Sequence, residues 1–127
     1  MYEQYKDDVQ FVVVYIREAH AIDSRSPGQT KEMIEDPITL LERAAVARIC
    51  LTKMELRPIP AVVDRLDDKV NTAYRGWPDR MFLVGKDGKM AYSGGRGPFG
   101  FSTEDLTKAI DKEIAKNKQT KLEQAGR

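Results

Sequence analysis

The segment Gln10–Ile16 constrains the fold more than any other part of the sequence. It reads Gln-Phe-Val-Val-Val-Tyr-Ile, a nearly unbroken run of β-branched and aromatic residues. Such a run is typical of a strand buried on both faces, as in a parallel sheet with helices on each side. The first prediction is therefore a central strand of an α/β fold.

The elements after this strand follow in the order that an α/β layer fold requires. A helical pattern covers about residues 37–54, and Asp36 with Pro37 forms a suitable N-cap and first turn. Residues 58–64 predict a short strand entered through prolines, and residues 67–74 predict a helical segment. The apolar side of the first helix would consist of Leu40, Leu41, Ala44, Ala45, Ala47 and Ile49.

The C-terminal part predicts a β-hairpin followed by a helix. Residues 81–84 and 89–92 flank the sequence Gly-Lys-Asp-Gly, in which Asp87 and Gly88 suit a turn that needs a positive φ. After a glycine-rich loop, which we interpret as a shaped turn, Ser102 or Thr103 would cap the last helix.

Length and charge limit the domain count and the class of partner. The 127 residues form one domain over residues 1–116 and a polar, flexible tail over residues 117–127. The 21 Lys and Arg residues against 20 Asp and Glu give a net charge of +1, so we expect no nucleic-acid or membrane-surface partner. The longest apolar run, residues 11–16, is too short to span a bilayer, and the first residues lack a secretory signal pattern. A cytoplasmic location is therefore expected.

The single cysteine, Cys50, rules out an internal disulfide, and no Cys and His cluster has the spacing of a metal site. Cys50 lies on the predicted helix among apolar residues, which favours a structural role as a small hydrophobe. The alternative is that Cys50 acts as a nucleophile.

Glu18 and His20 form the candidate catalytic pair. They stand two residues apart at the carboxyl end of the predicted strand, so they would point the same way, where ligands of α/β sheets gather. A carboxylate beside an imidazole can fix its tautomer and support proton transfer near neutral pH. The alternative is a surface histidine with a chance acidic neighbour.

Two motifs make the chain resemble the iodothyronine deiodinase family and its bacterial relatives. One is Tyr15-Ile-Arg-Glu-Ala-His20-Ala-Ile-Asp23, similar to the family's Tyr-Ile-x-Glu-Ala-His-x-x-Asp. The other is Tyr92-Ser-Gly-Gly-Arg-Gly-Pro-Phe99, similar to Tyr-x-Gly-Gly-x-Gly-Pro-Phe. A weaker third is Asp64-Arg-Leu-Asp67 followed by Ala73-Tyr74. The resemblance covers about residues 2–112.

The resemblance implies a thioredoxin-like fold, with three α/β/α layers, a C-terminal β-hairpin and a helix. In that family a further central strand precedes this stretch and ends in a loop with selenocysteine or cysteine, which nothing here matches. Residues 1–9 resemble the end of the helix after that loop. Without the strand a monomer would lose on the order of ten ladder hydrogen bonds of about 1 kcal/mol each. Direct pairing of the flanking strands, or strand exchange in a homodimer, would have to compensate.

The family's chemistry implies a thiol or selenol oxidoreductase that removes iodine reductively from an aromatic ring. Glu18 and His20 would deliver the proton, a thiol reductant would be the cosubstrate, and no other cofactor is expected. The partner would be a small aromatic or thiol substrate. The chain as given lacks the nucleophile, so we expect no turnover. The alternative is a non-catalytic thioredoxin-fold module for binding or dimerisation.

Three more residues take candidate roles in substrate binding from the resemblance. Tyr15 has the wrong parity for a regular strand, so a site role requires a bend after it. Pro78 matches the cis-proline position of thioredoxin-like folds, the alternative being a trans proline that enters a strand. Arg80 matches an arginine linked to the active site and could pair with Glu18 or a substrate carboxylate, or lie free on the surface.

The match begins at Met1 within a helix, which leads to a hypothesis about the gene. The reading frame would start at an internal methionine downstream of an in-frame UGA codon for selenocysteine. Upstream DNA without a continuing frame, a strand and a Cys or UGA codon would refute it.

Overall fold

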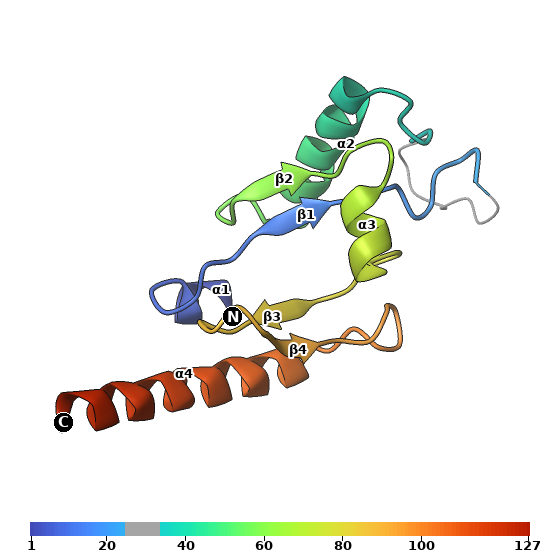
Figure 1. Cartoon of the computed structure of the whole chain (residues 1–127). Coiled ribbons are helices and arrows are strands. Elements are labelled where there is room, and N and C mark those ends of the chain that lie inside the picture. The colour runs from blue at the N-terminus through green and yellow to red at the C-terminus, as the bar shows by residue number, and fades with distance from the viewer. Residues whose placement is uncertain (25–33) are drawn as a thin grey trace. The chain divides into compact units, whose positions relative to one another are not determined.

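A computed structural model describes residues 1–24 and 34–127 of the chain (Figure 1). The predicted polar loop over residues 21–30 falls largely outside this range. The described residues divide into two compact units. The parallel-sheet unit comprises Phe11–Pro78, and the hairpin unit comprises Met1–Gln10 with Asp79–Arg127.

The parallel-sheet unit is built on two short strands and two helices. Strand β1 (Val13–Tyr15) pairs in parallel with β2 (Ala61–Val63), so that Val13 faces Ala61 and Tyr15 faces Val63 across the ladder. Helix α2 (Leu40–Lys53) connects them and packs on β2, and α3 (Lys69–Tyr74) follows β2 (Figure 1). This is the parallel β-α-β order that the sequence predicted.

β1 is shorter than predicted and is not buried on both faces. Val12 and Val14 keep 52% and 37% of their surface exposed, and Val62, the ladder partner of Val14, keeps 53%. Side chains alternate between the two faces of a strand, so these valines share one face. Within this unit α2 packs on the pair, and a single helix layer covers only one face of it.

Helix α2 begins three residues later than the Asp36–Pro37 pair predicted. Thr39 is the N-cap: its hydroxyl accepts the Glu42 backbone N–H at 3.2 Å, and the Glu42 carboxylate accepts the Thr39 N–H at 3.2 Å. This reciprocal capping box satisfies two N–H groups that a proline start would leave open. The start at Pro37 is therefore wrong.

The prediction for the apolar side of α2 is confirmed at Ala47, which is buried, and is wrong for Leu40 and Leu41, which are exposed. Leu41 is 82% exposed, whereas Arg43 and Ala47 are the buried residues of the helix. The spacing of four residues places Arg43 and Ala47 on one face, one turn apart. An arginine at the centre of a buried face needs specific acceptors.

Those acceptors form a polar cluster at the carboxyl end of β2. The Arg43 Nη1 donates to the carbonyl oxygen of Arg65 at 2.7 Å, to the Asp68 carboxylate at 2.9 Å and to the carbonyl oxygen of Asp64 at 3.4 Å. A guanidinium with its donors in a rigid fork is suited to several acceptors at once. The cluster ties α2 to the loop between β2 and α3.

Asp64, which is 2% exposed, organises the start of α3. Its carboxylate accepts the backbone N–H groups of Arg65, Val70 and Asn71 at 2.8, 3.1 and 2.8 Å. The formal N-cap, Asp68, makes no capping hydrogen bond with its side chain because that carboxylate pairs with Arg43. Asp64 therefore caps α3 from the end of the preceding strand.

The hairpin unit contains the two antiparallel strands and two helices. Strand β3 (Phe82–Val84) pairs with β4 (Met90–Ser93), with an irregularity between Leu83 and Val84. Helix α4 (Thr103–Ala125) packs on both strands, and α1 (Tyr2–Tyr5) is a single turn (Figure 1). The hairpin prediction is confirmed, including the positive φ of 74° at Gly88 in the turn.

α4 starts as predicted and runs further than predicted. The Ser102 hydroxyl accepts the Asp105 N–H at 3.1 Å, which confirms the serine cap. The helix then continues past Lys116 to Ala125, where the sequence predicted a flexible tail. Its first half is anchored because Leu106 and Ile110 are buried, and the Tyr5 hydroxyl donates to Asp111 at 2.7 Å. The polar second half continues the helix through residues that favour it, such as Lys, Gln, Leu and Glu.

Helices and short sheets of both kinds make the chain an α/β protein, as predicted. Each described sheet has two strands: β1 with β2, and β3 with β4. Two-stranded sheets depend on packing against a helix for stability, which α2 and α4 supply.

Replacing Arg43 by leucine tests the polar cluster. We expect the free energy of unfolding to fall by about 3 kcal/mol, because the change leaves the Asp68 carboxylate and two carbonyl groups without their donor. Denaturation in urea measures the change. The control is Arg65→Ala, which removes an exposed ion pair with Asp67 and should cost less than about 1 kcal/mol. Equal effects of the two substitutions would contradict the role given to Arg43.

Candidate functional site

Tyr15 and Glu18 form the centre of the candidate site in the parallel-sheet unit. The Tyr15 hydroxyl donates to Glu18 Oε2 at 2.5 Å. The other carboxylate oxygen, Oε1, accepts the backbone N–H groups of Ala19 and His20 at 3.1 and 3.3 Å. Three donors therefore fix the orientation of one carboxylate just past the end of β1.

A bend in the chain produces this arrangement. β1 ends at Tyr15, so Glu18 and His20 do not continue a regular strand, and the argument from strand parity is wrong for them. The bend that a site role for Tyr15 required is confirmed, because the Tyr15 ring reaches Glu18. Hydrogen bonds to the Glu18 carboxylate replace the ladder bonds that a longer strand would have made.

The surroundings of Tyr15 keep its hydroxyl protonated. Burial, the hydrogen bond to Glu18 and the charge of Glu18 raise the pKa of Tyr15 well above its ordinary value. Each of these causes opposes the formation of a tyrosinate. Tyr15 thus acts as a hydrogen-bond donor to Glu18.

His20 is exposed, and its backbone N–H is its contact with Glu18. The turn formed by residues 18–20 presents the His20 residue to solvent next to an oriented carboxylate. This is the residue pair that the sequence selected, held by a main-chain hydrogen bond. An imidazole in this position is accessible to a ligand.

Cys50 lies on α2 in a setting that disfavours a thiolate. It is partly buried, and its thiol donates to the Met54 sulfur at 3.7 Å. Burial, and secondly the charge of Glu18, raise the pKa of the Cys50 thiol. A nucleophilic cysteine needs the opposite, a pKa lowered by positive charge or a helix N-terminus. The geometry favours the structural role over the catalytic one.

Pro78 ends the parallel-sheet unit, and the bond between Trp77 and Pro78 is cis. The cis form is the one that the sequence favoured over a trans proline. The Trp77 N–H donates to the side-chain oxygen of Asn71 at 3.0 Å, and the Asn71 N–H is one of the donors to Asp64. A line of hydrogen bonds thus connects the buried Asp64 to the segment that carries Pro78.

Arg80, in the hairpin unit, is engaged by its own neighbours. Its Nε donates to the Gly94 carbonyl oxygen, its Nη2 donates to the Ser93 hydroxyl at 3.1 Å, and its guanidinium lies 5.0 Å from the centre of the Phe82 ring. These contacts hold the end of β4 against the start of β3. The substrate role of Arg80 stays a prediction.

The glycine-rich loop after β4 is shaped by close backbone approach. A Cβ atom on Gly97 would lie 1.8 Å from the Asp79 carboxylate, and one on Gly95 would lie 2.9 Å from the Gly100 Cα. The neighbour of Gly95 is backbone that cannot move aside, so only glycine fits there, whereas a side chain at Gly97 would have to displace the Asp79 carboxylate. The Gly97 N–H also donates to the Asp79 carbonyl oxygen at 3.0 Å. This supports the interpretation of the loop as a shaped turn.

Two classes of site have no candidate in the described part of the chain. Within residues 1–24 and 34–127, no three His, Cys, Asp or Glu side chains come together as they would around a metal ion. None of the helices described is long and apolar enough to cross a membrane.

Sequence reasoning gave no supporting role to Arg43, Asp64 or Asn71, although Asp64 begins the third motif. They support the candidate site by fixing the loop after β2 and the segment before Pro78. A signal was present for two of them: an arginine one turn from the small residue Ala47 on a helix, and an aspartate directly after an apolar strand. Neither pattern identifies its partners, which are distant in sequence.

Known proteins resemble this chain over most of its length. The sequence model of iodothyronine deiodinase matches residues 1–114. The chain is 35% identical to the thyroxine 5-deiodinase of Sparus aurata over 103 residues, which are 81% of this chain and 38% of the relative. It is 33% identical to the human type II iodothyronine deiodinase over 125 residues, 94% of this chain and 45% of the relative. The chain therefore spans less than half the length of these relatives. On this evidence the chain belongs to the iodothyronine deiodinase family.

Proposed function

We propose that this chain carries the proton-delivery part of a deiodinase-type oxidoreductase that removes iodine from an aromatic ring. The observation that carries the proposal is the Glu18 carboxylate, fixed by Tyr15, Ala19 and His20 inside the region that matches the family. We also propose that the domain has the thioredoxin-like arrangement, supported by the parallel pair with its connecting helix and by the hairpin followed by α4.

The proposed reaction balances with one nucleophile and two equivalents of a thiol reductant, because replacing iodine by hydrogen takes two electrons. A selenolate or thiolate attacks the iodine, the carbon–iodine bond breaks, and the ring carbon takes up a proton. The nucleophile is left oxidised and carrying iodine. A first thiol displaces iodide and forms a mixed disulfide or selenenyl sulfide with the nucleophile. A second thiol then cleaves that bond, which regenerates the nucleophile and leaves the two thiols as a disulfide. In this scheme His20 delivers the proton, and Glu18, held by Tyr15, positions the turn that carries His20.

Cys50 does not supply the nucleophile in this proposal. It is the single cysteine of the 127 residues, and its pKa is raised rather than lowered. At neutral pH it is a protonated thiol, a poor nucleophile compared with a thiolate. The attacking group is therefore a selenocysteine or cysteine that is not among these residues.

The second candidate function is a non-catalytic binding or dimerisation module. The lack of an activated thiol in this sequence favours it for the 127 residues taken alone. The two candidates differ in one respect: only the first assigns a chemical role to Glu18 and His20.

Chemical rescue separates the two candidates. With dithiothreitol alone, we expect no iodide release from thyroxine by the chain or by Cys50→Ser. With a small selenol added, we expect the chain to raise the rate of iodide release several-fold over the selenol alone. Glu18→Gln and His20→Asn should return that rate to the selenol background, and Cys50→Ser should leave the rescue unchanged.

Each contrary result of that assay has a distinct meaning. Rescue that is unaffected by both Glu18→Gln and His20→Asn would refute the proton-delivery role. No rescue at all would favour the binding module. Turnover with dithiothreitol that disappears in Cys50→Ser would make Cys50 the nucleophile and overturn our view of its thiol.

The ionisation of Tyr15 gives a second test, independent of turnover. Ultraviolet titration of the chain, which has five tyrosines, should show a component far above the ordinary tyrosine pKa of about 10 that Tyr15→Phe removes. Glu18→Gln should lower that pKa because it removes the negative charge beside the hydroxyl. Since the folded state favours the protonated form, the stabilisation is complete below about pH 10 and is lost as the pH rises above it. A Tyr15 pKa that Glu18→Gln leaves unchanged would contradict the contact.

A further inference from the structure

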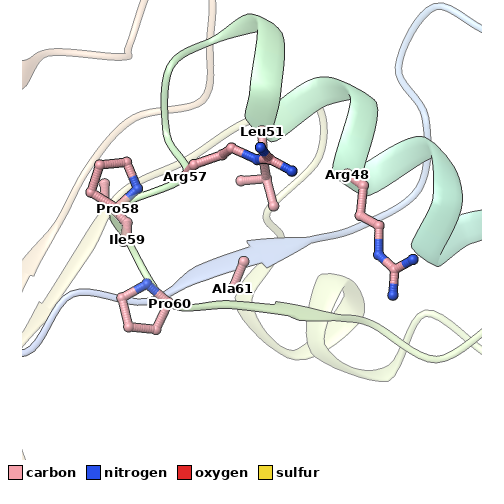
Figure 2. A pocket seen from close by; sticks show the side chains of 7 residues that line it. All are labelled: Arg48, Leu51, Arg57, Pro58, Ile59, Pro60 and Ala61. Carbon is pink, nitrogen blue, oxygen red and sulfur yellow. The ribbon is translucent and has the colours of Figure 1, made fainter.

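A hollow of about 380 Å³ lies in the parallel-sheet unit, between α2 and the segment that leads into β2 (Figure 2). Its apolar wall consists of Leu51, Pro58, Ile59, Pro60 and Ala61. Arg48 of α2 and Arg57 of the connecting segment line the same hollow. The volume falls in the range of small-molecule sites.

This hollow is separate from the candidate catalytic site. Ala61 is the first residue of β2, and β1 runs parallel to β2, so the hollow lies at the amino ends of the strands. Glu18 and His20 follow the carboxyl end of β1. The two sites therefore occupy opposite ends of the same strand pair, and the proposed dehalogenation makes no use of the hollow.

Within the described part of the chain, no acidic side chain neutralises the charge of the hollow. Three other arginines of this unit pair with carboxylates: Arg17 with Asp36, Arg43 with Asp68 and Arg65 with Asp67. Arg75, an exposed arginine of the same unit, has no carboxylate partner among the described residues. Among the described residues, no carboxylate pairs with Arg48 or Arg57, although the whole chain carries 20 acidic groups for 21 basic ones. Two like charges next to one apolar surface attract an anion from solution.

Arg48 and Arg57 come from two different segments that line the hollow, so a single ligand could contact both. Figure 2 shows the Arg57 side chain passing beside Leu51, with Arg48 one turn earlier on α2, on the side of the helix that faces Ala61. Guanidinium groups bind carboxylates through paired hydrogen bonds, and their stems tolerate apolar neighbours. The proline rings and Leu51 provide a surface for a hydrocarbon body and none for a fully hydrated ion.

We propose that this hollow binds a small amphipathic carboxylate, with its carboxylate at Arg48 and Arg57 and its hydrocarbon part against Leu51 and the prolines. The ligand class follows from the two parts of the lining. The guanidinium groups would bind the carboxylate of the ligand, and the apolar wall would bury its hydrocarbon chain.

Titration of the full chain with octanoate, followed by the amide resonances of Leu51, Ile59 and Ala61, tests the site. We expect saturable shifts of these resonances. Arg48→Gln and Arg57→Gln should each weaken octanoate binding about tenfold, the loss typical of a charge-assisted hydrogen bond. Octanol and inorganic phosphate should each bind at least about tenfold more weakly than octanoate. Octanol has the hydrocarbon chain but no negative charge, and phosphate has the charge but no hydrocarbon chain. The control Arg75→Gln, an exposed arginine at the end of α3, should bind octanoate unchanged.

A further variant keeps both arginines and tests whether weaker octanoate binding could come from loss of folding. Ala61→Glu places a carboxylate in the wall, where it competes for the guanidinium groups, and should abolish octanoate binding with a native spectrum elsewhere. Octanol binding equal to octanoate binding would reduce the site to an apolar surface. Phosphate binding equal to octanoate binding would reduce it to an anion site. Either result, no shifts with octanoate, or arginine variants that behave like Arg75→Gln would overturn the proposal.

Discussion

The guanidinium of Arg43 is the interaction on which the parallel-sheet unit depends. Its removal from water on the inner face of α2 is offset by carbonyl groups and a carboxylate at the end of β2. Because the Asp68 carboxylate pairs with Arg43, the Asp64 carboxylate accepts the N–H groups at the start of α3 in its place. Asn71, fixed at the start of α3, in turn holds the backbone of Trp77 before Pro78. One buried charge thus determines the course of the chain from β2 to the cis-proline.

The candidate catalytic residues at the end of β1 are likewise held by a few hydrogen bonds to one charged group, Glu18. The strand stops at Tyr15, and the next residues bend so that Glu18 accepts its neighbours' N–H groups and the tyrosine hydroxyl. A carboxylate with three donors keeps its position without a rigid sheet around it. The two polar groups, Glu18 and the Arg43 cluster, follow the carboxyl ends of neighbouring parallel strands, which is where α/β proteins place ligands. The arginine-lined hollow lies at the other end of the same strands.

Local sequence signals predicted the turns and helix caps that are stabilised by residues close together in the sequence. The turn at Gly88 and the serine cap of α4 were predictable, because each depends on backbone preference or on neighbours within a few residues. The parallel pair is a long-range contact between Val13–Tyr15 and Ala61–Val63, and it was predictable because a helix between two strands favours parallel pairing. The start of α2 was missed because the capping box at Thr39 competes with Pro37, and periodicity does not rank the two. The helical conformation of residues 117–125 was not predicted, because polar residues were taken as a sign of flexibility although many of them favour a helix. The flexibility of this segment stays a prediction.

The sequence by itself determined the family and the α/β class, since motifs and strand propensity are written in consecutive residues. It also selected Glu18 and His20 as the candidate pair, whose catalytic role stays a prediction. Only the tertiary structure decided how those residues are used. It buried Arg43 in place of the leucines of α2 and turned Glu18 back onto Tyr15. It also placed Arg48 and Arg57 beside an apolar hollow, with no carboxylate partner among the described residues. The physical reason is that the partners of a charged group are chosen by proximity in space, and the acceptors of Arg43 lie more than twenty residues away along the chain.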